Sequence, residues 1–236
     1  MGTERLGRSV QTSVNSKSIH NIFSSRLSLL KSKSAVNHSD KNIIKHQGIL
    51  KLISAIGPLR YKIPLWKSVN EAILYSIIGQ MLSVSATTAI ISRLIKRFKS
   101  AENIIKWATK NYRTAGPICG VSMRKRKALN AWYQYSSDNK NNIKRWNKMT
   151  TNEFRNEIKT IWGLGRWSAD MLAIFHLGRR DVWPATDIGI KKISMQLFAT
   201  DDYKIIKKYI VNNETMIALY FWEAIDNKLF KNGQFN

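Results

Sequence analysis

A carboxylate and a short glycine-rich segment are the residues whose types and spacing suggest chemistry. The segment reads Gly163-Leu164-Gly165, and Asp187 follows after a further helical pattern. A buried carboxylate can stabilise positive charge that develops in a transition state, and it can orient a water molecule for attack. Asp187 could instead be the N-cap of a helix that begins at Ile188, and the residue types alone leave both interpretations open.

The glycine segment lies between two helical patterns and predicts a sharp turn. Glycine tolerates positive φ and lets a partner approach the backbone closely. The amides of Gly163, Gly165 and Ser168 would then point outward at the start of the second helix, where unpaired N–H groups form an anion site. Arg166 would add attraction for a phosphate. The alternative for a Gly-x-Gly sequence by itself is a plain turn between two packed helices.

The composition indicates a polyanionic partner. Lys and Arg number 39 against 15 Asp and Glu in 236 residues, which gives a formal net charge of +24. Such self-repulsion favours nucleic acid as the partner, with a merely basic solvated surface as the alternative. Cys119 is the only cysteine, and the four histidines are scattered. We therefore expect no disulfide, no cysteine-rich metal site and no cofactor.

The helical patterns predict an all-α fold with two helical subdomains and an active-site cleft between them. Helices are expected over residues 42–56, 69–78, 83–98, 101–109, 125–136, 150–161, 166–177, 186–199 and 214–230. We expect one subdomain over about residues 69–150, and the other from residues 41–68 plus 151–236. The uncharged stretch 72–92 contains polar residues and is split by Gly79, which favours two buried helices over a membrane span.

Residues 1–40 differ in composition from the rest of the chain. They are rich in serine, basic and nearly free of acids, with no sustained helical period. This composition predicts a flexible basic arm that precedes the folded domain of residues 41–236. A transit peptide or a cloning artefact would have a similar composition, so these alternatives remain open.

The motifs resemble those of the helix-hairpin-helix DNA glycosylases, specifically the 3-methyladenine DNA glycosylase II branch. The hairpin of residues 161–165, followed by Asp187, is similar to the hairpin and catalytic aspartate of that family. Residues 77–83 resemble its Gly-Gln helix turn, and residues 119–125 resemble its second, basic turn. The resemblance extends over about residues 45–230. The chain departs from the family at residue 81, where methionine replaces the second glutamine of the usual pair.

The resemblance implies roles for individual residues. Asp187 would stabilise the charge on the sugar of a nucleotide that is flipped out of the duplex. The implied base pocket consists of Trp167, Trp183, Met171 and Trp222. The implied DNA contacts are Gly163, Gly165, Arg166, Ser168, Gln80, Arg124, Lys125 and Lys127. The implied monovalent cation site, for Na⁺ or K⁺, uses the backbone carbonyls of Lys159, Ile161 and Leu164.

Some of these residues have a structural alternative. Trp167 could be a core residue instead of a stacking surface for the base. Gln80 could fill the gap that a flipped nucleotide leaves, or it could cap a helix end. The basic residues 124–127 could approach phosphates, or they could form a solvated face.

Trp167 also bears on the type of reaction. Bifunctional relatives carry a lysine two residues after the second glycine of the hairpin, and this chain has Trp167 there. An indole cannot form a Schiff base, so we expect a monofunctional glycosylase that leaves an abasic site without cleaving the strand. Alkylated purines of the 3-methyladenine type are positively charged, and an aromatic face would attract them.

We therefore expect a glycosylase that excises alkylated purines from DNA in base excision repair. The alternatives are a catalytically silent DNA-binding module that uses the same hairpin, and a glycosylase for deaminated or mismatched bases. The expected partner is double-stranded DNA with a damaged base. The protein is expected to be a monomer that lies inside the cell with the DNA, in a bacterial cytoplasm or a eukaryotic nucleus.

Overall fold

The computed structural model describes residues 46–59, 65–66, 68–111, 118–231 and 234–235. The expected basic arm and the first residues of the helix expected over 42–56 lie outside the described residues. The helices are α2 (Gln47–Ile56), α3 (Val69–Gly79), α4 (Val84–Phe98), α5 (Ala101–Asn111), α6 (Met123–Asp138), α7 (Lys140–Arg145), the 3₁₀ helix η2 (Trp146–Lys148), α8 (Thr151–Lys159), α9 (Arg166–Phe175), α10 (Ile188–Phe198), α11 (Tyr203–Ile210) and α12 (Glu214–Asp226).

The all-α prediction is confirmed. The named strands in the described part of the chain are two antiparallel pairs of residues, β1 (Phe230–Lys231) and β2 (Gln234–Phe235). Two helices were not expected from the sequence, the short α7 and the amphipathic α11. The helix expected over 214–230 ends at Asp226, and the chain then turns into β1.

Side chains that cap the first amides fix several helix starts. Ser68, Ser83 and Ser122 each accept a hydrogen bond from an amide in the first turn of α3, α4 and α6. Thr150 and Glu153 form the capping box that their spacing predicts at the start of α8. These caps fix where α3, α4, α6 and α8 begin.

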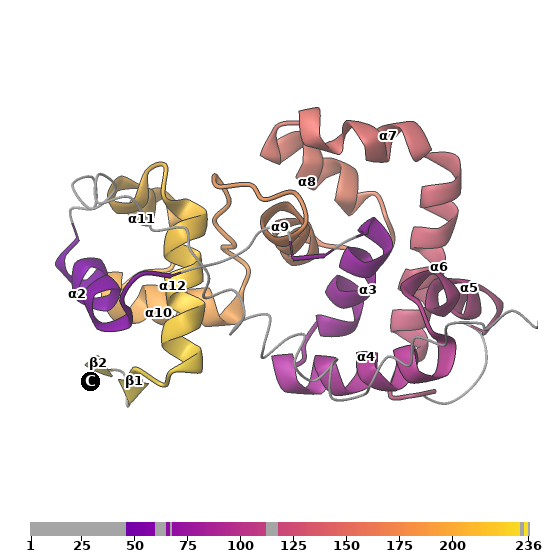
Figure 1. Ribbon diagram of the computed structural model, residues 1–236. Coiled ribbons are helices and arrows are strands. Elements are labelled where there is room, and N and C mark those ends of the chain that lie inside the picture. Colours follow the sequence, from indigo (N-terminus) through magenta and orange to yellow (C-terminus); the bar gives the residue numbers. More distant parts are fainter. Residues whose placement is uncertain (1–45, 60–64, 67, 112–117, 232–233, 236) are drawn as a thin grey trace, which may run out of the picture.

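The larger hydrophobic core lies among α3 to α9. It includes Ile77 on α3, Leu129 and Trp132 on α6, Phe154 on α8 and Leu172 on α9, all of them fully buried. Figure 1 shows α3 to α8 grouped on one side of the molecule, with α9 near the middle. The hairpin residues Ile161 and Leu164 belong to this core too, so the hairpin is built into its edge.

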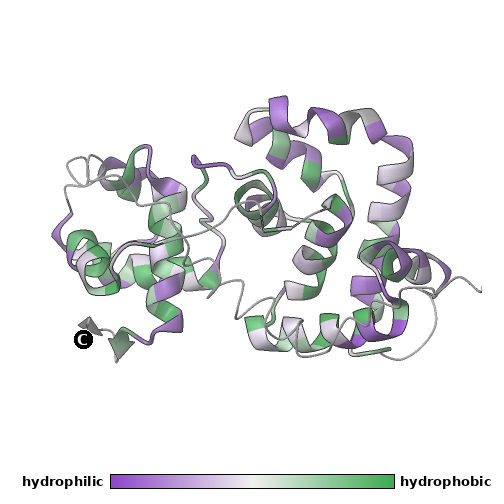
Figure 2. Cartoon of the chain, viewed as in Figure 1, coloured by the Kyte–Doolittle hydropathy of each residue, from purple (hydrophilic) through white to green (hydrophobic). Residues whose placement is uncertain are grey.

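A second core lies among α2, α10, α11 and α12. It joins Leu52 of α2, Ile193 of α10, Ile206 of α11 and Phe221 of α12, together with Trp183 from the loop before α10. Figure 1 shows these four helices together on the opposite side of the molecule. Figure 2 shows hydrophobic residues along α9 and α12, which form parts of the two cores, whereas α7 is mainly hydrophilic.

The division between the cores corrects the expected domain boundary. We placed the boundary near residue 150, but α8 and α9 pack with α3 to α6. The change of core falls between Val182 and Trp183. The second lobe therefore consists of α2 plus the chain from Trp183 onward. The physical reason is that the buried faces of α8 and α9 find their partners in α3 and α6, which the sequence order does not reveal.

Candidate active site

Asp187 lies at the start of α10 and is surrounded by hydrogen-bond donors. Its Oδ1 accepts the amide of Ile190 at 3.0 Å, so the N-cap role proposed as the alternative is confirmed. Its Oδ2 accepts the indole N–H of Trp167 at 2.8 Å, and Oδ1 also accepts the indole N–H of Trp222 at 3.2 Å. The cap does not exclude chemistry, because the carboxylate stays half-buried rather than enclosed.

The two tryptophans come from different lobes. Trp167 is on α9 and packs with the first core, and its ring edge lies beside Gly79, where an added Cβ would be 3.7 Å from Cη2 of Trp167. Trp222 is on α12 and packs against both cores. The ring of Trp222 also lies 5.6 Å from that of Phe175 at the end of α9. Asp187 therefore lies where the two lobes meet, and an active site at this place stays a prediction.

A glycine lets α12 approach the start of α10. A Cβ added at Gly189 would lie 2.7 Å from Cδ1 of Ile225 and 3.2 Å from Oδ1 of Asp187. The Cδ1 atom is the far end of the exposed Ile225 side chain, so a small residue at position 189 would require that side chain to shift. The start of α10 and the helix that carries Trp222 are thus in close contact.

The loop that carries Asp187 is anchored at Trp183. Trp183 is 2% exposed, stacks on Tyr203 and meets the edge of Phe221. We expected Trp183 to line a base pocket, and its burial corrects this role to a packing one. The loop is further tied to α12, because Thr215 Oγ1 accepts the amide of Val182 at 3.1 Å.

Met171 requires a similar correction. It was expected beside the base, but it is 7% exposed and belongs to the first core. Of the four residues expected in the pocket, the structure brings Trp167 and Trp222 to Asp187. Sequence spacing could not distinguish Trp167 and Trp222 from Trp183 and Met171, because all four are large apolar residues in or next to helices.

The hairpin between α8 and α9 uses its two glycines differently. Gly163 has φ of 86°, and an added Cβ would lie 2.6 Å from the Cβ of Ala128 on α6. Gly163 is thus required by the fold. Gly165 is the N-cap of α9 without a side-chain cap, and an added Cβ there would meet nothing within 4 Å. The first amides of α9 have no intrahelical partners, and the open space at Gly165 lets an anion reach them.

Gln80 braces this hairpin. Its Nε2 donates to the carbonyl of Gly163 at 2.8 Å and to Ser168 Oγ at 3.0 Å. The side chain of Ser168 is buried, so only its amide remains for the predicted DNA contact. Gln80 is also the C-cap residue of α3, so its alternative position at a helix end is confirmed. Its side chain makes internal hydrogen bonds in place of the expected DNA contact.

The residue after Gln80 was not among the expected DNA contacts. Met81 is 89% exposed and has φ of 58°, in the left-handed region that non-glycine residues rarely adopt. It stands at the turn between α3 and α4, which Gln80 fixes against the hairpin. The signal available in the sequence was an apolar residue in a turn, between Gly79 and the helix cap Ser83.

Arg166 takes part in an ion-pair network. Its Nε donates to Asp170 Oδ2 at 3.1 Å, and Arg155 Nε donates to Asp170 Oδ1 at 2.6 Å. Burial raises the pKa of the Asp170 carboxyl, and the two guanidinium groups oppose that rise. The Arg166 side chain remains 42% exposed beside the hairpin, a position compatible with the predicted phosphate contact.

The basic residues at the start of α6 do not form one face. Arg124 and Lys127 are exposed, whereas Arg126 is fully buried. Lys125 Nζ donates to the carbonyl of Ile78 at 2.7 Å, and burial lowers the pKa of this ammonium. The expected phosphate contact by Lys125 is therefore corrected to a contact with the end of α3, where the carbonyls carry partial negative charge.

Lys127 is directed toward the hairpin. Its Nζ lies 4.3 Å from the ring centroid of Trp162, which is 42% exposed. This cation–π contact places a basic group and an exposed aromatic ring next to Gly163. Arg124 and Lys127, together with Arg166 and the open amides of α9, thus form a basic surface around the hairpin, which we call the hairpin surface.

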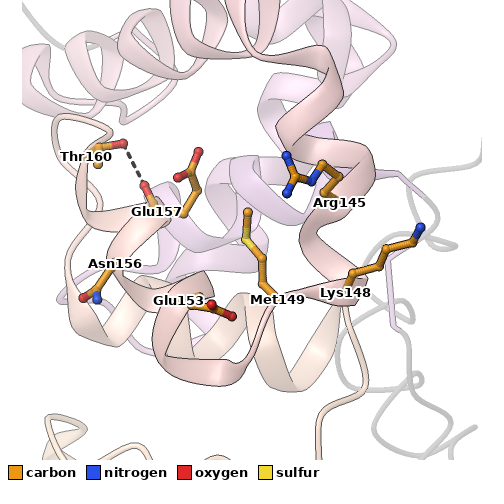
Figure 3. Close-up of a pocket in the computed structure, with 7 residues that line it drawn as sticks. All are labelled: Arg145, Lys148, Met149, Glu153, Asn156, Glu157 and Thr160. Carbon is orange, nitrogen blue, oxygen red and sulfur yellow. Dashed lines mark hydrogen bonds between the residues drawn. The ribbon is translucent and has the colours of Figure 1, made fainter.

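Other candidate sites are weaker. A hollow of about 480 Å³ lies away from Asp187. Figure 3 shows the residues that line it: Arg145, Lys148, Met149, Glu153, Asn156, Glu157 and Thr160. These residues include none of the partners of Asp187, and their charges are mixed. Within the described residues, no group of three His, Cys, Asp or Glu side chains could hold a metal ion. At the expected monovalent cation site the Ile161 carbonyl accepts the Leu164 amide at 3.0 Å, and the cation itself stays a prediction.

The helices of the described residues were compared with the length and apolar character of a membrane span. None of these helices is long and apolar enough to cross a membrane. The uncharged stretch 72–92 forms parts of α3 and α4, as expected.

Comparison with known proteins gives two relatives in fission yeast. No family model matches the chain. Over 199 residues it is 26% identical to the alkylbase DNA glycosidase-like protein mag2 of Schizosaccharomyces pombe, which covers 78% of this chain and 89% of that protein. Over 174 residues it is also 26% identical to DNA-3-methyladenine glycosylase 1 of the same organism, which covers 67% of this chain and 73% of that protein.

A solved structure shares the fold. The S. pombe 3-methyladenine DNA glycosylase Mag1, in complex with abasic DNA, superposes with a TM-score of 0.59 at 21% identity, over 80% of this chain and 93% of that one. The chain is therefore similar in sequence to these two fission-yeast proteins, and it shares the fold of Mag1. Helices α8 and α9 and the glycine hairpin between them are arranged as a helix-hairpin-helix, and Asp187 follows α9.

Proposed function

We propose that this protein is a DNA glycosylase that flips alkylated purines of the 3-methyladenine type out of DNA and excises them. The observation that carries the proposal is the position of Asp187, which is half-buried between the lobes and fixed by Trp167, Trp222 and the first turn of α10. The names of the two fission-yeast relatives support the same class of reaction. A helix cap by itself needs only the bond from the Ile190 amide to Oδ1, so the two indole donors from different lobes are what favours a catalytic role over a module that only binds DNA.

In the proposed mechanism, Asp187 stabilises the positive charge that develops on the sugar. When the bond from C1′ to the base breaks, the bonding electrons leave with the base and positive charge develops on the sugar. The carboxylate of Asp187 stabilises that charge and orients a water molecule, whose oxygen bonds to C1′ while its proton passes to solvent. A methylated purine carries positive charge before the bond breaks, so it leaves as a neutral base. The reaction then needs no strong general acid.

The hairpin surface would hold the DNA. Free amides at the start of α9 would donate hydrogen bonds to a phosphate, and Arg124, Lys127 and Arg166 would add positive charge around it. Met81 extends from the braced turn beside the hairpin and is the exposed apolar residue that we assign to the duplex. We infer that it occupies the space left by the flipped nucleotide, because base extrusion costs stacking energy that an inserted apolar side chain can partly replace.

We also propose that the product is an intact strand with an abasic site. Trp167 stands where a bifunctional enzyme would need an amine, and its indole N–H is committed to Asp187. Lys125 is directed to the end of α3 rather than to Asp187. A Schiff base with the sugar is therefore not expected.

The test is to treat DNA with a methylating agent, incubate it with the protein, and identify the released bases by chromatography. We expect free 3-methyladenine and 7-methylguanine, strand breaks only after alkali or heat, and no covalent adduct after borohydride. Release of neither base would refute the proposed function. Release of bases with efficient borohydride trapping would refute only the proposal of a monofunctional enzyme.

A further inference from the structure

The two indole N–H groups on Asp187 have a consequence beyond positioning. We propose that Trp167 and Trp222 are positioning residues whose donors make the site selective for bases that already carry positive charge, over neutral damaged bases. This inference rests on the proposed function. It differs from a stacking role for these tryptophans, because it depends on their N–H groups and not on their ring faces.

The Asp187 carboxylate already accepts most of the hydrogen bonds that it can form. An ionised carboxylate has about four acceptor positions. Three are filled, by Trp167 Nε1 at 2.8 Å, Trp222 Nε1 at 3.2 Å and the Ile190 amide at 3.0 Å. About one position is left for the attacking water or for the sugar. Asp187 thus resembles a fixed charge with little freedom to form new hydrogen bonds.

The three N–H donors also reduce the negative charge that Asp187 presents to the sugar. Each N–H donor stabilises the negative charge of Asp187 before the reaction begins. Two of the three donors belong to side chains that the fold holds firmly, since Trp222 packs against both cores and Trp167 against the first. The carboxylate therefore stabilises the developing positive charge on the sugar less strongly than a carboxylate without these donors would.

Cationic and neutral bases differ in how much stabilisation of the sugar cation their release requires. A cationic base leaves as a neutral molecule, and the weakened carboxylate suffices for it. A neutral base such as hypoxanthine leaves as an anion unless it is protonated, so its departure requires more stabilisation of the sugar cation. Among the described residues, the acid that accepts from Trp167 and from Trp222 is Asp187 itself. A carboxylate with three of its acceptor positions filled thus slows the release of neutral bases more than that of cationic ones.

The test replaces each indole by a ring without the donor, as Trp222→Phe and Trp167→Phe. Single-turnover rates are measured on two duplexes, one with 7-methylguanine and one with hypoxanthine, at saturating protein so that binding does not contribute. Removal of one donor should raise the ratio of the hypoxanthine rate to the 7-methylguanine rate by about 5- to 20-fold, from the strength of a hydrogen bond to a charged group. The absolute rate on 7-methylguanine is free to fall, since orientation is lost as well.

Trp183→Phe is the matched control. It removes an indole that anchors the same loop by packing against Tyr203 and Phe221 instead of bonding to Asp187. A purely structural disturbance should change both rates by the same factor and leave their ratio within about twofold. Circular dichroism checks the fold of each variant, and the two tryptophan positions serve as independent tests.

The outcomes separate the two proposals. If the wild type releases neither base, the proposed function itself is wrong. If the wild type releases 7-methylguanine and the ratio rises in the Phe variants but not in Trp183→Phe, the inference is supported. A ratio that stays unchanged in both Phe variants, or a wild type that releases hypoxanthine as fast as 7-methylguanine, would overturn it.

Discussion

The two hairpin glycines should respond differently to alanine. Gly163→Ala should mainly lower the stability of the fold, whereas Gly165→Ala should mainly weaken DNA binding. Gly163→Ala places a methyl group 2.6 Å from the Cβ of Ala128, whereas apolar carbons prefer about 3.5–4.0 Å. The contact is with a helix side chain that has no rotamer to move away. Gly163 also has φ of 86°, which costs a non-glycine residue about 1–2 kcal/mol.

The magnitude follows from these two terms. Overpacking in a filled core costs about 1–3 kcal/mol, so the sum for Gly163→Ala is about 2–5 kcal/mol. For a chain of this size, 1 kcal/mol corresponds to about 2–4 °C in Tm, which predicts a fall of about 4–20 °C. Gly165→Ala meets nothing within 4 Å and should lower the free energy of unfolding by about 1 kcal/mol or less, the cost of alanine at an N-cap.

DNA affinity should show the reverse order of effects. A methyl at Gly165 occupies the space through which a phosphate would reach the first amides of α9, and loss of that contact should weaken binding by about 5- to 30-fold. The assay is fluorescence anisotropy with a labelled duplex at fixed salt, paired with thermal unfolding of the same samples. If Gly165→Ala binds DNA as tightly as the wild type, the open amides are not a phosphate site.

The remaining predictions concern charge. Asp170→Asn leaves Arg155 buried without its counter-charge and should lower the free energy of unfolding by about 3–5 kcal/mol in denaturant titration, and a loss under 1 kcal/mol would contradict a structural network. Replacing Arg124 and Lys127 by glutamine should reduce the slope of log affinity against log salt by about 1–2 units, and an unchanged slope would assign both to solvated surface. Burial lowers the pKa of His176, so the unfolded chain takes up a proton near pH 6.5 that the folded chain resists. The free energy of unfolding should therefore fall as the pH drops below about 6.5, and by less in His176→Gln, whereas identical pH curves would refute this.

The sequence was most informative where the chemistry is local. The Gly163–Gly165 turn, the capping box at Thr150 and the cap at Asp187 all depend on residues within three or four positions of each other. The patterns that define α3, α4, α6 and α9 are also local, and these helices were predicted with small errors at their ends. Short helices such as α7 gave too little periodicity to be recognised.

The sequence failed where a role depends on long-range packing. Trp183 and Trp222 are both tryptophans next to or within apolar helices, and only the assembled lobes put one in a core and the other at Asp187. Lys125 directly follows Arg124 and lies two residues before Lys127, and both of these residues are exposed. Lys125 is nevertheless directed to the end of α3. Its role depends on where α3 ends relative to α6.

The domain boundary failed for the same reason. Helix α8 follows the expected boundary in the sequence, but the partner of its buried residue Phe154 is Trp146, whose ring lies 5.3 Å away in the first core. A boundary read from chain order assigns neighbouring segments to one unit. The hydrophobic faces, in contrast, select their partners by shape across the whole chain.

The most direct test of Asp187 as the catalytic carboxylate measures base release and DNA affinity on one variant, Asp187→Asn. Asparagine can still cap α10 and accept from an indole, so the fold is retained while the negative charge is lost. We predict that release of 7-methylguanine falls by at least about 100-fold, as expected for loss of a group that stabilises transition-state charge, while DNA affinity is unchanged or tighter. Wild-type release by Asp187→Asn would contradict the account, because Asp187 would then be a helix cap alone.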